Sequence, residues 1–295
     1  MKSFEKLKLN AYAKVNISLD ITGVFANGMH QVETVMHTIN LADVVSIELN
    51  TKIKTNRQIF VSSNKYFIPT SEKNLAHQAA TVVLNDFPHR KEPIYIHIKK
   101  NVPVGAGLGG GSSDAATTIK GINQLLRLGL THEKMEKYAA KIGSDVPFLL
   151  GKGACLATGT GTDLRKIPSI NNCSAVLVNP GIFVSTKDVY ALYDSCDIPA
   201  DAHPNTTKII EAIEQGNYAA LVGQLKNVLE IPVFKIHSQI AELKTELIKA
   251  GCDTALMSGS GSTVYGLSQD CEKLEAIKKM YIDKGYKAFV VNFIG

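Results

Sequence analysis

The segment PVGAGLGGGSSDAA, residues 103–116, decides the fold and is the most informative part of this chain. Five of the seven residues from 105 to 111 are glycine. Because glycine has no Cβ, it adopts positive φ and leaves backbone N–H groups uncovered, so such a run can fold into a concave set of amide donors. The segment therefore predicts a binding site for a multiply charged anion, most simply a polyphosphate. A flexible linker is the alternative.

The flanking residues favour the anion site over the linker. Residues 94–98 alternate between apolar and polar side chains, which indicates a strand. After the glycines, Ala115, Ile119, Ile122 and Leu126 recur at helical spacing, and Gly129 supplies a stop. A strand, a glycine loop and a helix N-terminus in this order combine amide donors with the positive end of a helix dipole.

Two common phosphate-binding motifs do not fit this segment. Gly105, Gly107 and Gly110 satisfy G-x-G-x-x-G, but the residues from Thr131 read as another helix instead of the strand and acidic residue of a dinucleotide site. No P-loop lysine follows the glycines, and the catalytic-loop and D-F-G strings of eukaryotic-type protein kinases are missing.

The segment resembles the second of three motifs of the GHMP kinases. The matching positions are Pro103, Gly107, Leu108, Gly109, Ser112, Ser113 and Ala115. AYAKVNISLD at 11–20 is similar to the first motif of that superfamily, and ALMSGSGSTVY at 255–265 is similar to the third. Since the three motifs occur in the expected order across almost the whole chain, the resemblance implies an ATP-dependent kinase that uses Mg²⁺ and a small-molecule acceptor.

Further strings narrow the resemblance to one branch of the superfamily. AKVN at 13–16, NGMH at 27–30, the triple glycine and IGSDVPF at 142–148 are similar to the kinases that phosphorylate the 2-hydroxyl of 4-diphosphocytidyl-2-C-methyl-D-erythritol in non-mevalonate isoprenoid synthesis. That branch has tyrosine before the histidine, where this chain has Met29. A homoserine, mevalonate or sugar kinase and a non-catalytic nucleotide-binding protein are the alternatives.

The order of the expected elements indicates an α+β fold, with helices gathered on one side of the strands. The resemblance implies a two-domain GHMP kinase-like fold with ATP in the cleft between the domains. It implies a ribosomal-protein-S5-like N-terminal domain at 1–158 and an α/β sandwich at 159–295. Expected helices cover 74–84, 131–142, 206–216, 236–250 and 271–284, and expected strands cover 17–22, 32–49, 94–98, 175–178, 254–257, 263–267 and 288–292. Residues 151–161 are expected to form tight turns and a crossing between the halves.

Composition limits the other classes of function. The net charge of +5 suits an anionic small molecule, but no long run of basic residues supports nucleic-acid binding. Five widely spaced cysteines without a C-x-x-C pair indicate neither a zinc site nor a disulfide framework. Because the sequence has no apolar signal and no run of 18 apolar residues, we expect no membrane span and a cytoplasmic protein. We also expect a monomer or a homodimer.

The glycine segment is expected to hold the nucleotide. Its members in this role are Pro103, Val104, Gly105, Ala106, Gly107, Leu108, Gly109, Gly110 and Gly111. The hydroxyl groups of Ser112 and Ser113 would reach phosphate oxygens or Mg²⁺, and Asp114 is a candidate N-cap of the following helix. Lys100 is either a solvated strand end or a cation that supports the phosphates. The resemblance places Asn74 and Lys100 near adenine.

Two residues far from the glycine segment are the expected catalytic pair. Asp145 lies in GSDVP between two expected helices, and its spacing alone favours an N-cap. The resemblance instead implies that Asp145 is the catalytic base. Lys14 stands in the middle of an expected strand, as either a surface lysine or, by the resemblance, the partner of Asp145. Asn16, two residues on, shares its strand face and could orient the same end of the substrate.

Four residues are expected to recognise the acceptor. By the resemblance, His30 contacts cytosine, and Met29 occupies the position of the stacking tyrosine. Thr186 and Tyr190 match positions near the cytidine, although Tyr190 could equally be core packing.

Overall fold

The computed structural model describes residues 4–50, 52 and 58–295. These residues form two compact units, each assembled from separate parts of the chain. Unit 1 takes its described residues from 1–13, 41–102 and 109–151, and unit 2 consists of 14–40, 103–108 and 152–295. The two long strands β1 (Phe4–Val24) and β2 (His30–Asn50) therefore contribute residues to both units.

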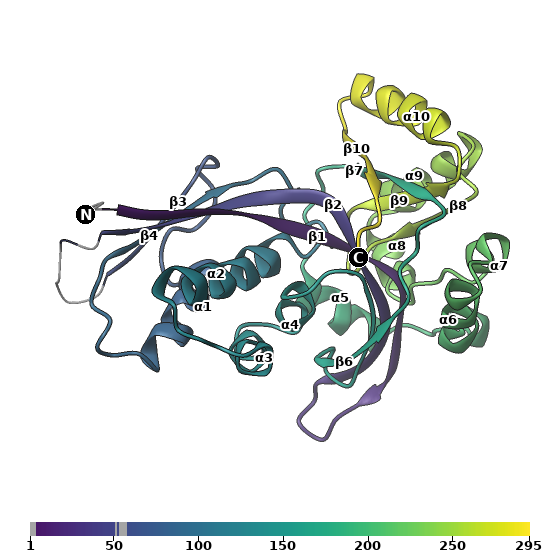
Figure 1. The fold of residues 1–295 in the computed structure, drawn as a ribbon. Helices are drawn as coiled ribbons and strands as arrows, with labels where there is room; N and C mark the ends of the chain where they lie inside the picture. The colour runs from purple at the N-terminus through teal and green to yellow at the C-terminus, as the bar shows by residue number, and fades with distance from the viewer. Residues whose placement is uncertain (1–3, 51, 53–57) are drawn as a thin grey trace. The chain divides into compact units, whose positions relative to one another are not determined.

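In unit 1, helices cover one face of a small sheet. β4 (Ile94–Lys99) pairs antiparallel with the second half of β2, and β3 (Ile59–Ser63) lies parallel to β4. Residues 94, 96 and 98 of β4 are buried, whereas 95, 97 and 99 are exposed, so only one face of the strand is covered. Helices α1 (Leu75–Asn85) and α2 (Gly110–Leu126) lie side by side on the covered face (Figure 1). Helices α3 (His132–Ala140) and α4 (Asp145–Leu149) complete the unit.

The glycine at position 121 sets how closely α2 approaches the sheet. A Cβ on Gly121 would lie 2.5 Å from Cδ1 of Ile47 in β2. A Cβ at this position would require the end of the Ile47 side chain to move, with Leu9 Cδ1 already 3.5 Å from the same point. Glycine at 121 therefore allows α2, whose N-terminus carries the end of the glycine segment, to lie close to β2.

In unit 2, a four-stranded antiparallel sheet has the strand order β10-β7-β9-β8. Its strands are β7 (Ser174–Asn179), β8 (Thr254–Met257), β9 (Val264–Ser268) and β10 (Lys287–Asn292). The helices of the unit are α5 (Thr186–Tyr193), α6 (Thr206–Glu214), α7 (Tyr218–Val222), α8 (Glu230–Ile236), α9 (Ser238–Lys249) and α10 (Cys271–Asp283), with a 3₁₀ turn at Ala200–Ala202. The first half of β2 pairs with β5 (Ala154–Thr158), and β5 pairs with β6 (Asp163–Ile167).

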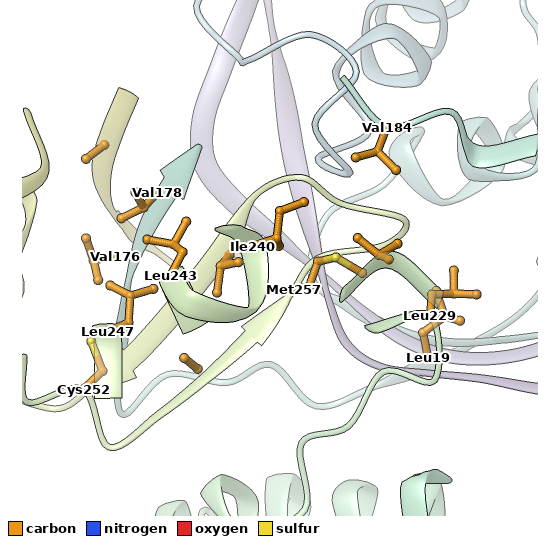
Figure 2. Packing of buried hydrophobic residues seen from close by; sticks show 14 of the residues in the cluster. Leu19, Val176, Val178, Val184, Leu229, Ile240, Leu243, Leu247, Cys252 and Met257 are labelled. Atoms are coloured by element: carbon orange, nitrogen blue, oxygen red, sulfur yellow. The ribbon is translucent and has the colours of Figure 1, made fainter. Parts of the chain in front are cut away.

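The core of unit 2 lies between this sheet and helices α9 and α10. Figure 2 shows Val176 and Val178 of β7 with Leu243 of α9, and Met257 at the end of β8. Leu19 of β1 and Leu229 belong to the same buried cluster. Because these side chains are buried, the strand that carries Lys14 is held by apolar packing a few residues further along the chain.

The expected α+β class is confirmed, but some elements differ from their predictions. Tight turns were expected over 151–161, but residues 154–158 form β5, which pairs with β6 in a hairpin. Gly159 and Gly161, both with positive φ, lie in the turn of this hairpin. The expected single helix at 236–250 is preceded by a separate helix, α8, and the two meet at His237, whose backbone is not helical. Within the described residues, no helix is long and apolar enough to cross a membrane.

Candidate active site

Residues 103–108 of the glycine segment are bonded to two other segments of unit 2. Lys14 N donates to Leu108 O at 3.0 Å, and Ser258 Oγ donates to Gly107 O at 2.9 Å. Gly107 has φ of +74°, and a Cβ there would lie 1.9 Å from Ser258 O. Glycine at 107 is therefore required both by its left-handed backbone and by the close approach of another backbone segment.

The rest of the glycine segment forms the start of α2 in unit 1. Gly109 is the N-cap residue, with φ of +66° and no side chain to bond the first helical N–H groups. The first turn also contains no acidic residue. Free N–H groups at the positive end of a 17-residue helix fit a phosphate group, so this position can hold part of the nucleotide.

The two serines at this helix start differ in their surroundings. Ser113 is buried, and its hydroxyl donates to Tyr12 O at 2.7 Å. Because a hydroxyl has a single proton, Ser113 can offer only lone pairs to a ligand, as a cation requires. Ser112 is half-buried, so its hydroxyl can reach a ligand as either donor or acceptor. Among the residues described, no three His, Cys, Asp or Glu side chains gather into a metal-binding group.

Lys100 lies in a buried ionic cluster beneath the first turn of α2. Its Nζ contacts Asp43 and lies 2.8 Å from Asp114 Oδ2. A Cβ on Gly110 would lie 3.3 Å from Nζ, so the glycine leaves room for the ammonium group. Burial opposes the charge of Lys100, but the two carboxylates outweigh it and raise the lysine pKa. Lys100 is thus neither a solvated strand end nor an exposed cation, and its contact with adenine stays a prediction.

The expected N-cap role of Asp114 is wrong. The helix begins at Gly110, four residues earlier, because the last glycines of the segment are themselves helical. Asp114 consequently lies inside α2 and is buried beside Lys100. Burial raises the pKa of Asp114 to about 7, although the Lys100 ammonium lowers it. Its Oδ1 has no hydrogen-bond partner among the described residues.

Asn74, the other residue expected near adenine, is the N-cap of α1. Its Oδ1 accepts a hydrogen bond from Ala76 N at 2.8 Å, and its Nδ2 donates to Pro69 O at 2.7 Å. Asn74 is buried. Its side chain therefore has a structural role in unit 1, whatever contact it makes with a nucleotide.

Lys14 and Asn16 lie on the same face of β1 in unit 2, as strand alternation predicts. Lys14 Nζ donates to Asn16 Oδ1 at 2.6 Å, and both residues are buried. Asn16 Nδ2 donates in turn to Thr34 Oγ1 at 2.8 Å. A lysine side chain is rarely buried without a use for its charge, which makes Lys14 a candidate for chemistry.

The third motif, residues 255–265, is also bonded to the first motif in unit 2. Asn16 N donates to Ser258 Oγ at 3.3 Å, and Tyr265 Oη donates to Asn16 O at 2.9 Å. Asn227 supports the same segment, because its Nδ2 donates to Met257 O and Gly259 O, each at 2.8 Å. The segment is thereby held rigidly against the strand that carries Lys14.

Asp145 lies in unit 1 as the first residue of α4, with Ser144 as the N-cap residue. It is half-buried, and Val146 to Leu149 after it are buried. A carboxylate in the first turn is stabilised by the helix dipole. The short buried helix holds Asp145 in place while leaving the side chain partly accessible.

His30, Tyr190 and Asp194 form an aromatic and charged group in unit 2. The ring centroids of His30 and Tyr190 are 4.9 Å apart, and His30 Nε2 lies 2.7 Å from Asp194 Oδ1. Met29, beside His30, is 50% exposed. Thr186 is not hydrogen-bonded to this group in the contacts described; its hydroxyl forms a hydrogen bond of 2.8 Å with Ser260 Oγ. Tyr190 is partly buried against the core cluster, so packing accounts for part of its position.

Three residues near these groups were not predicted from the sequence: Thr34, Asn227 and Asp194. Each lies many positions from its partner along the chain, so no local spacing could indicate it. The capping pattern at Ser185 and Asp188, by contrast, could have revealed α5, which carries Tyr190.

Comparison with known proteins gives two matching family models. The model described as GHMP kinases N terminal domain matches residues 74–153, and that described as GHMP kinases C terminal matches residues 209–287. Together they cover more than half of the chain.

Several curated relatives share the name 4-diphosphocytidyl-2-C-methyl-D-erythritol kinase. The protein from Geobacillus sp. (strain WCH70) is 43% identical over 290 residues, which is 98% of each chain. The protein from Syntrophomonas wolfei is 40% identical over 284 residues, covering 96% of this chain and 97% of the relative.

Solved structures show the same fold. A crystal structure of 4-(cytidine 5'-diphospho)-2C-methyl-D-erythritol kinase matches with a TM-score of 0.78 at 26% identity, covering 98% of this chain and all of that one. Homoserine kinase from Cytophaga hutchinsonii matches with a TM-score of 0.76 at 20% identity, covering 99% and 96% of the two chains, which shows a common fold alone.

Proposed function

The chain belongs to the GHMP kinases, and from this premise we propose that it phosphorylates the 2-hydroxyl of 4-diphosphocytidyl-2-C-methyl-D-erythritol with ATP. The reaction would supply a step of non-mevalonate isoprenoid synthesis. The observation that carries the proposal is that hydrogen bonds in unit 2 join segments of all three motifs. Lys14 N of the first donates to Leu108 O of the second, and Ser258 Oγ of the third donates to Gly107 O. Relatives with 40–43% identity carry the name of this kinase.

The nucleotide phosphates would be held by the glycine segment and the N-terminus of α2. This assignment rests on the helix start at Gly109, which has no side-chain cap and no acidic residue in its first turn. Mg²⁺ would neutralise phosphate charge as it does in other phosphoryl transfers. Ser112 and the lone pairs of Ser113 are the groups that could reach this ion.

Asp145 and Lys14 would carry the chemistry. Asp145 is the proposed base that accepts the proton of the acceptor hydroxyl, as the matching string of the family implies. Lys14, already buried and oriented by Asn16, would stabilise the negative charge that develops on the acceptor oxygen and the transferred group. Asn16 would orient the same end of the acceptor through this contact with Lys14.

The acceptor's cytosine would bind around His30 and Tyr190. The contact with Asp194 holds one ring nitrogen of His30 and leaves the other for the base. Tyr190 and the exposed Met29 offer an aromatic and a thioether surface on which a base can lie. Thr186 would lie near the same nucleoside.

A coupled assay of ADP release tests the function. The wild-type protein is expected to turn over with the cytidylated methylerythritol and not with homoserine, mevalonate or galactose. Turnover with one of these alcohols alone would replace the proposed acceptor, and turnover with none would leave a nucleotide-binding protein.

The variant Asp145→Asn tests the base. We expect kcat to fall by about 10²- to 10⁴-fold with the unfolding midpoint unchanged. Asp283→Asn removes an exposed carboxylate at the end of α10 and is the matched control. Near-normal turnover of Asp145→Asn would remove Asp145 from the mechanism.

We also propose that the protein works in the cytoplasm, as a monomer or a homodimer. Sedimentation at several protein concentrations would distinguish the monomer from the homodimer. The division of the chain at 158/159 stays a prediction, to be tested by limited proteolysis.

A further inference from the structure

We propose that Thr34 is a positioning residue for catalysis, because its hydroxyl sets the orientation of Asn16 and, through Asn16, the position of the Lys14 ammonium group. The inference rests on the proposed function in one respect, namely that Lys14 acts in phosphoryl transfer. It adds a residue from β2 that lies outside all three motifs.

The contacts form a continuous line within unit 2. Lys14 Nζ donates to Asn16 Oδ1 at 2.6 Å, and Asn16 Nδ2 donates to Thr34 Oγ1 at 2.8 Å. Thr34 Oγ1 donates to Ser18 O at 2.5 Å. The line thus runs from a proposed catalytic cation to a backbone carbonyl of the same strand, β1.

The carbonyl at the end fixes the direction of every bond in the line. A carbonyl oxygen can only accept, so the single proton of Thr34 points to Ser18. Thr34 Oγ1 must then accept from Asn16, which places the NH₂ group of the amide toward Thr34. The amide oxygen consequently faces Lys14, and an ammonium group can only donate. With the amide turned by 180°, two N–H groups would face each other at Lys14.

Burial makes this orientation strict. Lys14, Asn16 and Thr34 are 4%, 2% and 5% exposed, so water cannot readily replace a lost partner. The backbone of Asn16 is also held, through its bonds with Ser258 and Tyr265. The side-chain amide is then free to rotate only about its own torsions, and its contacts with Thr34 and with Lys14 favour the same one of its two orientations.

The change Thr34→Val keeps the size of the side chain but removes the hydroxyl. The Asn16 amide would lose its acceptor, and its oxygen would be held less firmly against the Lys14 ammonium group. Since an error in position affects the transition state more than substrate binding, we expect kcat to fall by about 10- to 100-fold. KM for ATP should change less than about twofold, because the glycine segment is not touched.

Two further variants separate positioning from packing. Thr34→Ser restores the hydroxyl and should recover most of kcat. Thr38→Val is the matched control, because Thr38 is also buried in β2 and its hydroxyl donates to a backbone carbonyl, Gly153 O at 3.3 Å. It should leave kcat unchanged. A similar loss in Thr34→Val and Thr38→Val, or no recovery in Thr34→Ser, would overturn the inference.

A double-mutant cycle tests the route through Asn16. In the Asn16→Ala background, Thr34→Val should reduce kcat no further, because the amide it orients is gone. An undiminished effect of Thr34→Val in that background would show that Thr34 acts in another way.

NMR of the Asn16 side-chain amide gives a readout that does not depend on turnover. In the wild type its N–H signals should exchange slowly with solvent, and in Thr34→Val, or in Thr34→Ala if the valine variant does not fold, they should shift and exchange faster. Unchanged amide signals would overturn the inference. If the wild type does not phosphorylate the cytidylated substrate, the proposed acceptor fails, while this amide measurement still decides the role of Thr34.

Discussion

Acidification should destabilise unit 2 through one buried histidine, His37 of β2. Its Nδ1 donates to Thr38 O at 2.9 Å, and its Nε2 accepts from Ile170 N at 3.0 Å. Burial lowers the pKa of His37 from 6.5 to about 4, although the Thr38 carbonyl raises it in part. Protonation would place a second N–H at Nε2, directly facing the N–H of Ile170, so the neutral ring is the form that fits.

The size of the effect follows from the two pKa values. The unfolded chain binds a proton at His37 below pH 6.5, whereas the folded chain resists this until about pH 4. The stabilisation is therefore complete above pH 6.5 and is lost as the pH falls from 6.5 to 4. For a change from pH 7.5 to pH 4.5, proton linkage gives a loss of about 2.5 kcal/mol in the free energy of unfolding.

Urea unfolding at the two pH values measures this loss. Carboxylates also titrate over this range, so the same curves are needed for His37→Gln, whose amide oxygen can still accept from Ile170. The pH-dependent loss in the wild type should exceed that in His37→Gln by about 2.5 kcal/mol. Equal losses would refute the reasoning, and so would an NMR titration of His37 in the folded protein with a pKa near 6.5.

Four further substitutions test the close packing at Gly107 and the ionic cluster around Lys100. Gly107→Ala should cost at least about 3 kcal/mol of unfolding free energy, because a Cβ would overlap Ser258 O. Gly285→Ala has similar positive φ but open space, should cost only about 1 kcal/mol, and would contradict the packing argument if it cost as much. Lys100→Met should cost about 3–5 kcal/mol because it leaves two buried carboxylates without their cation. Asp114→Asn keeps the shape and should cost about 1 kcal/mol at pH 7, and urea curves showing the reverse order would contradict the ionic cluster.

Much of the fold could be predicted from local patterns. The alternation at 94–98 and the helical spacing after the glycine segment correspond to β4 and α2. The local pattern does not predict the β5–β6 hairpin, because β5 is rich in small residues and becomes part of a sheet only by pairing with β2 and β6. The start of α2 was placed too late because glycine has low helix propensity, yet here the glycines at 110 and 111 are helical.

Local patterns also place some residues of the candidate site and not others. Alternation along one strand was enough to place Lys14 and Asn16 on a common face. The hydrogen-bond partners of Asn16 could not be predicted from such a pattern, since Thr34 comes from the next strand and Ser258 lies 242 positions from Asn16. The surroundings of Lys100 could not be predicted either. Nothing in the residues next to it indicates that two carboxylates surround a lysine at a strand end.

The shared strands also limit how this chain can be shortened or recombined. Residues 13 and 14 are neighbours in β1 but belong to different units. A fragment that begins at 159 would lack residues 14–40 and 103–108 of unit 2, and with them Leu19 of its core and Lys14. Exchange of halves between related kinases would therefore transfer an incomplete core, so we expect the two units to be inherited and produced together.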